Sequence, residues 1–162
     1  MNNTSRRLVS GGLIIMAMTV STATLAQDAK TALQIVNPQG LYDPSPIGYS
    51  QVVIVPAGRR IAYISGQGGA DGKGQLSPDF STQVEQAYAN LNTALKGIGA
   101  RPEQVAKLTV YVVDHDPSKL GVLTESVVGM FGKTLPAQTL VAVPKLALDT
   151  MLFEVEAVVI LD

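Results

Sequence analysis

Apolar residues recur at the spacing of an α-helix in the segment that follows Pro78. Serine before proline is typical of a helix start, because serine caps the first backbone amides and proline fits the first turn. Ser77 and Pro78 stand at this point, and Gly97 and Gly99 are typical of a helix end. The pattern predicts a helix of about 18 residues. Its apolar stripe consists of Phe80, Val84, Ala87, Leu91, Leu95 and Ile98.

A second helical pattern begins at Asp116 and Pro117 and stops before Gly132. Proline again stands where the first turn of a helix needs no backbone amide. Apolar residues three or four positions apart predict one buried face. That face consists of Leu120, Leu123, Val127 and Met130 or Phe131.

Aliphatic and β-branched residues gather in short runs that are typical of strands. Residues 51–55 and 61–65 are separated by residues 56–60, which predicts a hairpin with a five-residue loop. The remaining strand-like runs are residues 105–113, 138–143 and 152–161. The predicted order is ββαβαββ, an α+β domain with a mainly antiparallel sheet and two helices on one face.

Several of these strands carry apolar residues on both faces. The runs "QVVIV", "LTVYVV" and "EAVVIL" do not alternate as a sheet with one solvated face should. Two helices cover only one face of a sheet. We therefore expect another copy of the chain to cover the other face, in a closed cyclic oligomer.

Residues 1–26 have the layout of an export signal. Arg6 and Arg7 precede an uncharged stretch, residues 8–20, and small residues lead up to Ala26. An uncleaved anchor is the alternative, but polar residues dilute the run below the roughly 20 apolar residues of a spanning helix. We expect cleavage, a periplasmic or secreted protein and no stable membrane insertion afterwards. The arginine pair leaves both the general secretory and the twin-arginine route open.

Residues 27–46 are rich in proline, glycine and aspartate and predict an irregular lead-in to one domain over residues 47–162. Without residues 1–26 the chain keeps 10 basic and 13 acidic side chains, a net charge of −3. Nucleic-acid-binding surfaces are normally basic, so we expect no nucleic-acid partner. The chain has no cysteine, which excludes disulfides and a thiol nucleophile.

Cofactor-binding patterns are also absent from the sequence. The glycine-rich residues 66–75 lack the spacing of a phosphate-binding loop, and we interpret them as a flexible turn. His115 is the only histidine, and a solvated or capping role is favoured over a catalytic one. With no cluster of histidine or cysteine, we expect neither a metal site nor a cofactor.

Polar residues interrupt the last strand at Glu154 and Glu156. Residues two apart in a strand point to the same face, with α-carbons roughly 6 to 7 Å apart. One interpretation is a general acid or base at a subunit interface. The other is an edge strand that acidic side chains keep soluble.

Six motifs in order and spacing resemble the Rid family, also called YjgF or L-PSP, of imine and enamine deaminases and their relatives. They are "IGYSQVV" (47–53), "YISGQGG" (63–69), "NLNTALKGIGA" (90–100), "VAKLTVYVVD" (105–114), "LPAQTLVAV" (135–143) and "FEVEAVV" (153–159). The resemblance covers roughly residues 47–161. It implies a chorismate-mutase-like α+β subunit, a homotrimer and small-molecule clefts at the subunit interfaces.

The resemblance also implies roles for individual residues. In active deaminases of the family a tyrosine and a Ser-Gly pair line the cleft, which here match Tyr49, Ser65 and Gly66. A glutamate that positions the attacking water matches Glu154. The arginine that grips the carboxylate of a 2-imino acid does not match, because Gln138 stands at its position.

This departure weakens the implied activity. A glutamine lacks the charge and the donor fork of arginine, and the lost ion pair would cost about 2 to 4 kcal/mol. Thr124 stands where many active members place a cleft asparagine. Lys133 is either a substitute cation or a solvated loop residue.

Three functions remain open at this point. The first is hydrolysis of imines or enamines assisted by Glu154, with a substrate that need not carry a carboxylate. The second is a trimer that binds a metabolite, or shields unfolded chains, without turnover. Ribonuclease activity, a description carried by some relatives, is disfavoured by the acidic charge and by the lack of a basic groove.

Overall fold

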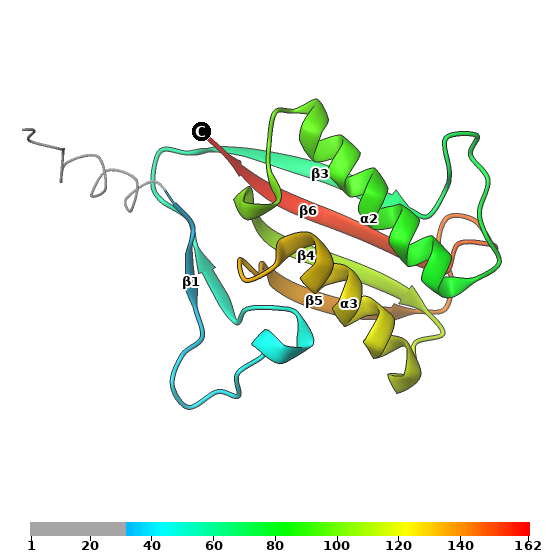
Figure 1. The fold of residues 1–162 in the computed structure, drawn as a ribbon, viewed down its shortest axis with the longest axis horizontal. Helices are drawn as coiled ribbons and strands as arrows, with labels where there is room; N and C mark the ends of the chain where they lie inside the picture. Colours follow the sequence, from blue (N-terminus) through cyan, green and yellow to red (C-terminus); the bar gives the residue numbers. More distant parts are fainter. Residues whose placement is uncertain (1–31) are drawn as a thin grey trace, which may run out of the picture.

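A computed structural model describes residues 32–162 of the chain (Figure 1). The expected signal peptide, residues 1–26, and the first residues of the lead-in lie outside this range. Among residues 32–162, no helix is long and apolar enough to cross a bilayer.

The main sheet of the described residues has four strands in the order β3-β6-β4-β5. They are β3 (Arg60–Gly68), β6 (Phe153–Leu161), β4 (Val105–Val113) and β5 (Ala137–Val143). β6 pairs antiparallel with β3 and β4, whereas β5 runs parallel to β4. The predicted α+β class with a mainly antiparallel sheet is confirmed.

Two α-helices, α2 (Phe80–Gly97) and α3 (Leu120–Phe131), lie side by side over the same face of this sheet (Figure 1). α3 forms the crossover between the parallel strands β4 and β5. The core fills the space between helices and sheet. Its fully buried members include Val84, Leu91, Leu95, Leu108, Val110, Val112, Val127, Phe153, Val155 and Val159.

The start of α2 differs from the expected one. Asp79, not Ser77, is the cap, and its carboxylate accepts a 2.8 Å hydrogen bond from the backbone amide of Thr82. Hydrogen bonds from the Ser81 hydroxyl, then from Thr82, lower the pKa of Asp79 to about 2. A carboxylate satisfies the amides at a helix start more strongly than a hydroxyl does, so the helix begins two residues later.

The predicted hairpin between residues 51–55 and 61–65 is wrong. β2 (Val52–Ile54) pairs with β1 (Gln34–Val36), a strand within the lead-in that was expected to be irregular. β3 pairs instead with β6 and extends through Gly68, into the residues expected to form a loop. β6 offers nine residues for pairing and β2 only three, so the long-range pair buries more of β3.

Candidate functional site

The strand registers place Gln138 and Glu154 on opposite faces of the main sheet. Gln138 pairs with Leu108, which is fully buried beneath the helices, so its side chain faces the helix layer. Glu154 stands between Phe153 and Val155, both fully buried, so its side chain points to the opposite, outer face. One copy of the chain therefore does not bring these two residues into one cleft.

A pocket of about 370 Å³ lies on the helix side, at the edge formed by β5. It brings together three predicted site residues, Tyr49, Thr124 and Gln138. Four aliphatic residues and Thr139 complete the wall, and these residues are Ile47, Leu120, Leu123, Thr139 and Leu140. This pocket lies within a single subunit, whereas the family resemblance implied a cleft between subunits that also includes Glu154.

Tyr49 reaches this pocket through a tight local turn. The 3₁₀ turn η1 (Ser45–Ile47) ends at Gly48, whose φ of 87° lies in the left-handed region that glycine tolerates. A Cβ atom on Gly48 would also lie 3.4 Å from Val127 of α3. The turn packs on α3, where the hydroxyl of Thr124 donates to the carbonyl of Ile47 at 3.4 Å.

The amide of Gln138 is not satisfied by the protein. Its Oε1 atom is buried and has no hydrogen-bond partner. The hydroxyl of Tyr49, by contrast, is hydrogen-bonded to that of Tyr42. A buried carbonyl oxygen without a donor is uncommon in native proteins, and at the wall of a pocket it indicates a place for a ligand or water.

Lys133, considered above as a substitute cation, is exposed and does not line the pocket. Lys107 lies on the outer face, where its ammonium group donates to Thr139 at 2.5 Å. Lys119 donates to the carbonyls of Val113 and Asp114 at 2.9 and 2.7 Å. No lysine or arginine of residues 32–162 lines the pocket beside Gln138.

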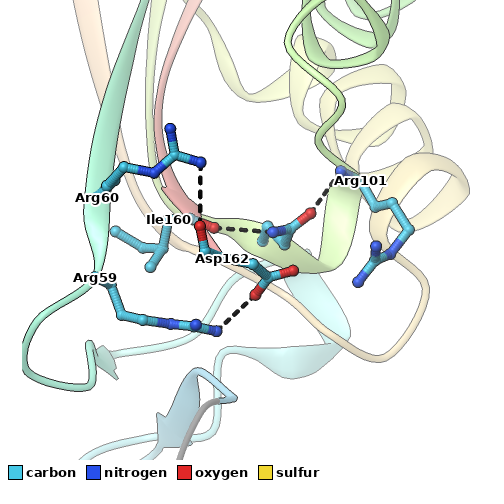
Figure 2. A network of polar contacts seen from close by, with 6 residues as sticks. Arg59, Arg60, Arg101, Ile160 and Asp162 are labelled. Atoms are coloured by element: carbon cyan, nitrogen blue, oxygen red, sulfur yellow. Dashed lines mark hydrogen bonds and ion pairs between the residues drawn. The ribbon is translucent and has the colours of Figure 1, made fainter.

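Arginine side chains gather instead at the far end of β6 (Figure 2). Arg59 forms a 2.6 Å ion pair with Asp162, and Arg60 donates to the backbone carbonyl of the same residue at 3.1 Å. This end of β6 lies seven residues from Glu154, about 23 Å along a strand. Within one subunit these arginines cannot supply a cation to Glu154.

Ser65, Gly66 and Glu154 form the second group of predicted residues. The pairing of β3 with β6 shifts between Ile64 and Gln67, so Ser65 and Gly66 form a β-bulge. A Cβ atom on Gly66 would overlap the carboxyl group of Glu154 and lie 2.8 Å from its Cγ. The bulge and the missing side chain together make room for the carboxylate of Glu154.

Further polar residues surround Glu154 on the outer face. Glu156 points the same way, as its spacing from Glu154 predicted, and accepts a 3.3 Å hydrogen bond from Tyr111. Partial burial raises the pKa of Tyr111, and the charge of Glu156 adds to this rise. Tyr63 is 78% exposed on the same face. The outer face is thus mixed in polarity and less apolar than the sequence pattern suggested.

Sequence reasoning missed Tyr111 and the aliphatic wall of the pocket. A two-residue period through β4 would have placed Lys107, Thr109 and Tyr111 on one face. Leu120 was assigned to the buried stripe of its helix, yet it is 46% exposed and lines the pocket. Residues 32–162 contain no group of three or more histidine, cysteine, aspartate or glutamate residues that could hold a metal ion.

The model of the Endoribonuclease L-PSP family matches residues 43–161 of the chain. The chain belongs to this family. The resemblance to Rid proteins drawn from six sequence motifs is thereby confirmed.

Individual Rid-family relatives support this membership. The 2-iminobutanoate/2-iminopropanoate deaminase of Rattus norvegicus is 35% identical over 120 residues, which cover 72% of this chain and 83% of the relative. A RutC family protein of Aquifex aeolicus is 37% identical over 73 residues, or 44% of this chain and just 56% of the relative's length. A crystal structure of a Rid-family protein of unknown function from Yersinia pestis matches with a TM-score of 0.76 and 32% identity, over 80% of this chain and 99% of that one.

Proposed function

We propose that this protein hydrolyses imine or enamine groups of small molecules in a deaminase-like reaction, with a substrate range altered by Gln138. The observation that carries the proposal is the carboxylate of Glu154, held on an open sheet face over the bulge at Ser65 and Gly66. Relatives at 35% and 36% identity are named 2-iminobutanoate/2-iminopropanoate deaminases. This supports the same class of reaction here.

In the proposed reaction Glu154 acts as a general base on water. Its carboxylate accepts a proton while the water oxygen bonds to the imine carbon, and the proton then passes to the nitrogen. The product of this addition is a carbinolamine. Its hydroxyl proton then passes through Glu154 to the nitrogen as the carbon–nitrogen bond breaks, so that ammonia leaves and a carbonyl compound remains. An enamine enters the same sequence after it takes up a proton on carbon and loses one from nitrogen to become an imine.

We further propose that the complete site lies between copies of the chain, in a homotrimer. Gln138 and Glu154 lie on opposite faces of one sheet, so a pocket that contains both needs a second subunit. The outer face around Glu154 is not covered by any element of residues 32–162 (Figure 1). An adjacent copy that seats its pocket edge on this face would bring the two groups together.

The test is ammonia release from imines formed in situ from amino acids and amino-acid amides by an oxidation step. The full-length protein should accelerate release, and Glu154→Gln should lower the rate by about 10²- to 10⁴-fold, the usual contribution of a general base. Glu85→Gln, on the exposed side of α2, is the matched control and should retain the rate. If neither kind of imine is hydrolysed faster than in buffer, the enzymatic proposal fails.

Binding without turnover is the second candidate, and the uncharged pocket beside Gln138 favours it, because the pocket can hold a ligand without the groups of a reaction centre. In that case Glu154→Gln would leave ligand affinity intact and no imine would be hydrolysed. A ribonuclease would need basic groups for the phosphate backbone, whereas only uncharged residues line this pocket.

A further inference from the structure

The pocket beside Gln138 has the chemistry of a site for a neutral, partly aliphatic molecule. Its volume of about 370 Å³ suits a compact ligand. Ile47, Leu120, Leu123 and Leu140 supply apolar contact, and the polar lining groups are hydroxyls and the single amide of Gln138. A ligand with an aliphatic side chain of the size of leucine would bury that side chain against these four residues.

The unpaired side-chain carbonyl of Gln138 determines which polar group the ligand needs. Its buried Oε1 atom has no partner in the protein and needs a hydrogen-bond donor. An ionised carboxylate has acceptors only, so it would oppose this oxygen and leave it unpaired. A carboxamide has both an N–H group and a carbonyl oxygen, and it can pair with the glutamine amide in both directions.

The absence of charged residues from the pocket also argues against a carboxylate ligand. A carboxylate that enters a pocket loses its hydration and needs a cation or several donors in return. None of the residues that line this pocket carries a charge, and Lys107 and Lys119, which adjoin lining residues Thr139 and Leu120, are bonded to other groups. Burial of a carboxylate here is therefore uncompensated within the described subunit.

We propose that the substrates are 2-imino carboxamides with an aliphatic side chain, and that 2-imino acids are disfavoured. This inference rests on the proposed function and names its substrate class. In the reaction, water adds to the imine carbon of the carboxamide, ammonia leaves from that carbon and a 2-oxo carboxamide remains. The carboxamide group itself is unchanged and pairs with Gln138.

Stable product analogues test the binding preference apart from the chemistry. The probes are 4-methyl-2-oxopentanamide and 4-methyl-2-oxopentanoate, which differ only in the amide and the carboxylate. We expect the full-length protein to bind the amide about 10- to 100-fold more tightly in calorimetric titrations, the range expected for one buried group left unpaired. Equal affinity, tighter binding of the carboxylate or binding of neither compound would overturn the proposal.

Substitutions at position 138 test whether Gln138 causes the preference for the amide over the carboxylate. Gln138→Leu should remove it by weakening binding of the amide, and Gln138→Arg should reverse it by adding a charged donor fork for the carboxylate. Gln75→Arg places the same charge on an exposed loop residue outside this pocket and should leave the preference unchanged. A preference that persists in Gln138→Leu would contradict the assignment of this residue.

The two proposals fail separately. A protein that prefers the amide analogue but releases no ammonia from any imine contradicts only the proposed enzymatic function. A protein that hydrolyses imino acids and imino carboxamides alike, with no preference between the two analogues, contradicts only the substrate class. Circular dichroism of each variant shows whether it is folded before its binding is interpreted.

Discussion

The side chain of Glu154 occupies the space that a side chain at position 66 would need: a Cβ atom on Gly66 would lie 2.8 Å from Glu154 Cγ and nearer still to its carboxyl group. Glutamate is flexible and can rotate away, so the carboxylate would move before the fold gave way. The glycine at the bulge is thus a requirement of the candidate site more than of the sheet.

Gly66→Ala separates these two effects. We expect ammonia release to fall at least about tenfold, because the displaced carboxylate no longer faces the water. The free energy of unfolding should drop by less than about 2 kcal/mol, since a side-chain end can move aside. Gly72→Ala, in open space, is the control in activity assays and urea titrations. Full activity in Gly66→Ala would argue against the role of Glu154.

Gly69→Ala should instead act mainly on the stability of the fold. A Cβ atom at this position would lie 2.5 Å from the Cα atom and the carbonyl oxygen of Gln83, both in the backbone of α2. Backbone cannot move aside as a side chain does, so we expect a loss of about 1 to 3 kcal/mol in the free energy of unfolding. Denaturant titration measures it, and a stability equal to that of the unmodified protein would contradict the close packing of the segment directly after β3 against α2.

Gln83 is a buried amide that joins three segments. Its Nε2 donates to the carbonyls of Ser77 and Thr150 at 2.6 and 2.8 Å, and its Oε1 accepts from the amide of Leu152 at 2.9 Å. Gln83→Leu leaves these backbone groups unpaired and should cost about 2 to 4 kcal/mol. Thermal unfolding provides the measurement, with the exposed Gln75→Leu as the matched control. A shift no larger than that of the control would refute the structural role.

Asp79 predicts a pH dependence of stability. Its pKa is about 2 in the folded chain against an ordinary value of 3.8, so the cap stabilises fully above about pH 4. As the pH falls toward 2 the carboxylate takes up a proton and the contribution is lost. The difference in Tm between the unmodified protein and Asp79→Ala should therefore be largest above pH 4 and shrink toward pH 2. A difference in Tm that is constant over this range would mean that the charge of Asp79 does not contribute to stability.

We propose that the chain is exported and cleaved near Ala26. Expression in a bacterium with an outer membrane, followed by fractionation and N-terminal sequencing, should recover a periplasmic chain that begins near Gln27. Arg6→Lys combined with Arg7→Lys distinguishes the routes, because the twin-arginine route depends on the arginine pair and the general route needs only positive charge. Recovery of the uncleaved chain from the cytoplasm would contradict the proposal.

Subunits with different defects should restore activity to one another. Gln138→Leu and Glu154→Gln remove groups on opposite faces, so a mixed oligomer would contain some interfaces with both groups intact. After joint unfolding and refolding at equal amounts, about a quarter of the interfaces should be complete, and ammonia release should exceed that of either variant alone. The same variants refolded separately and then mixed serve as the control. No gain on joint refolding would place both groups in one subunit.

Local sequence signals predicted the elements with strong periodicity. The strand at residues 105–113 and the helix after Pro78 were predicted correctly. A run of β-branched residues and an apolar stripe with a 3.6-residue period both depend only on residues close together in the sequence. Tyr49, Thr124 and Gln138 were proposed as site residues from the family resemblance; all three line one pocket, and their role in binding stays a prediction.

Long-range pairing could not be predicted in the same way. Whether residues 61–65 pair with their neighbours or with β6 depends on partners almost a hundred residues away, and the local pattern is the same in both cases. The separation of Gln138 from Glu154 has the same origin, because the face on which Gln138 lies is set by its register with Leu108. Ser77 and Asp79 are both residue types that cap helices, and the structure uses Asp79, whose carboxylate is the stronger acceptor.

The division of site residues between two faces of one sheet ties activity to concentration. Under the proposed assembly an isolated chain holds two incomplete halves, and catalysis begins only when chains associate. Specific activity should then be constant at high protein concentration and fall on dilution once the oligomer dissociates, whereas an enzyme with its site inside one chain would keep the same turnover per molecule at every dilution.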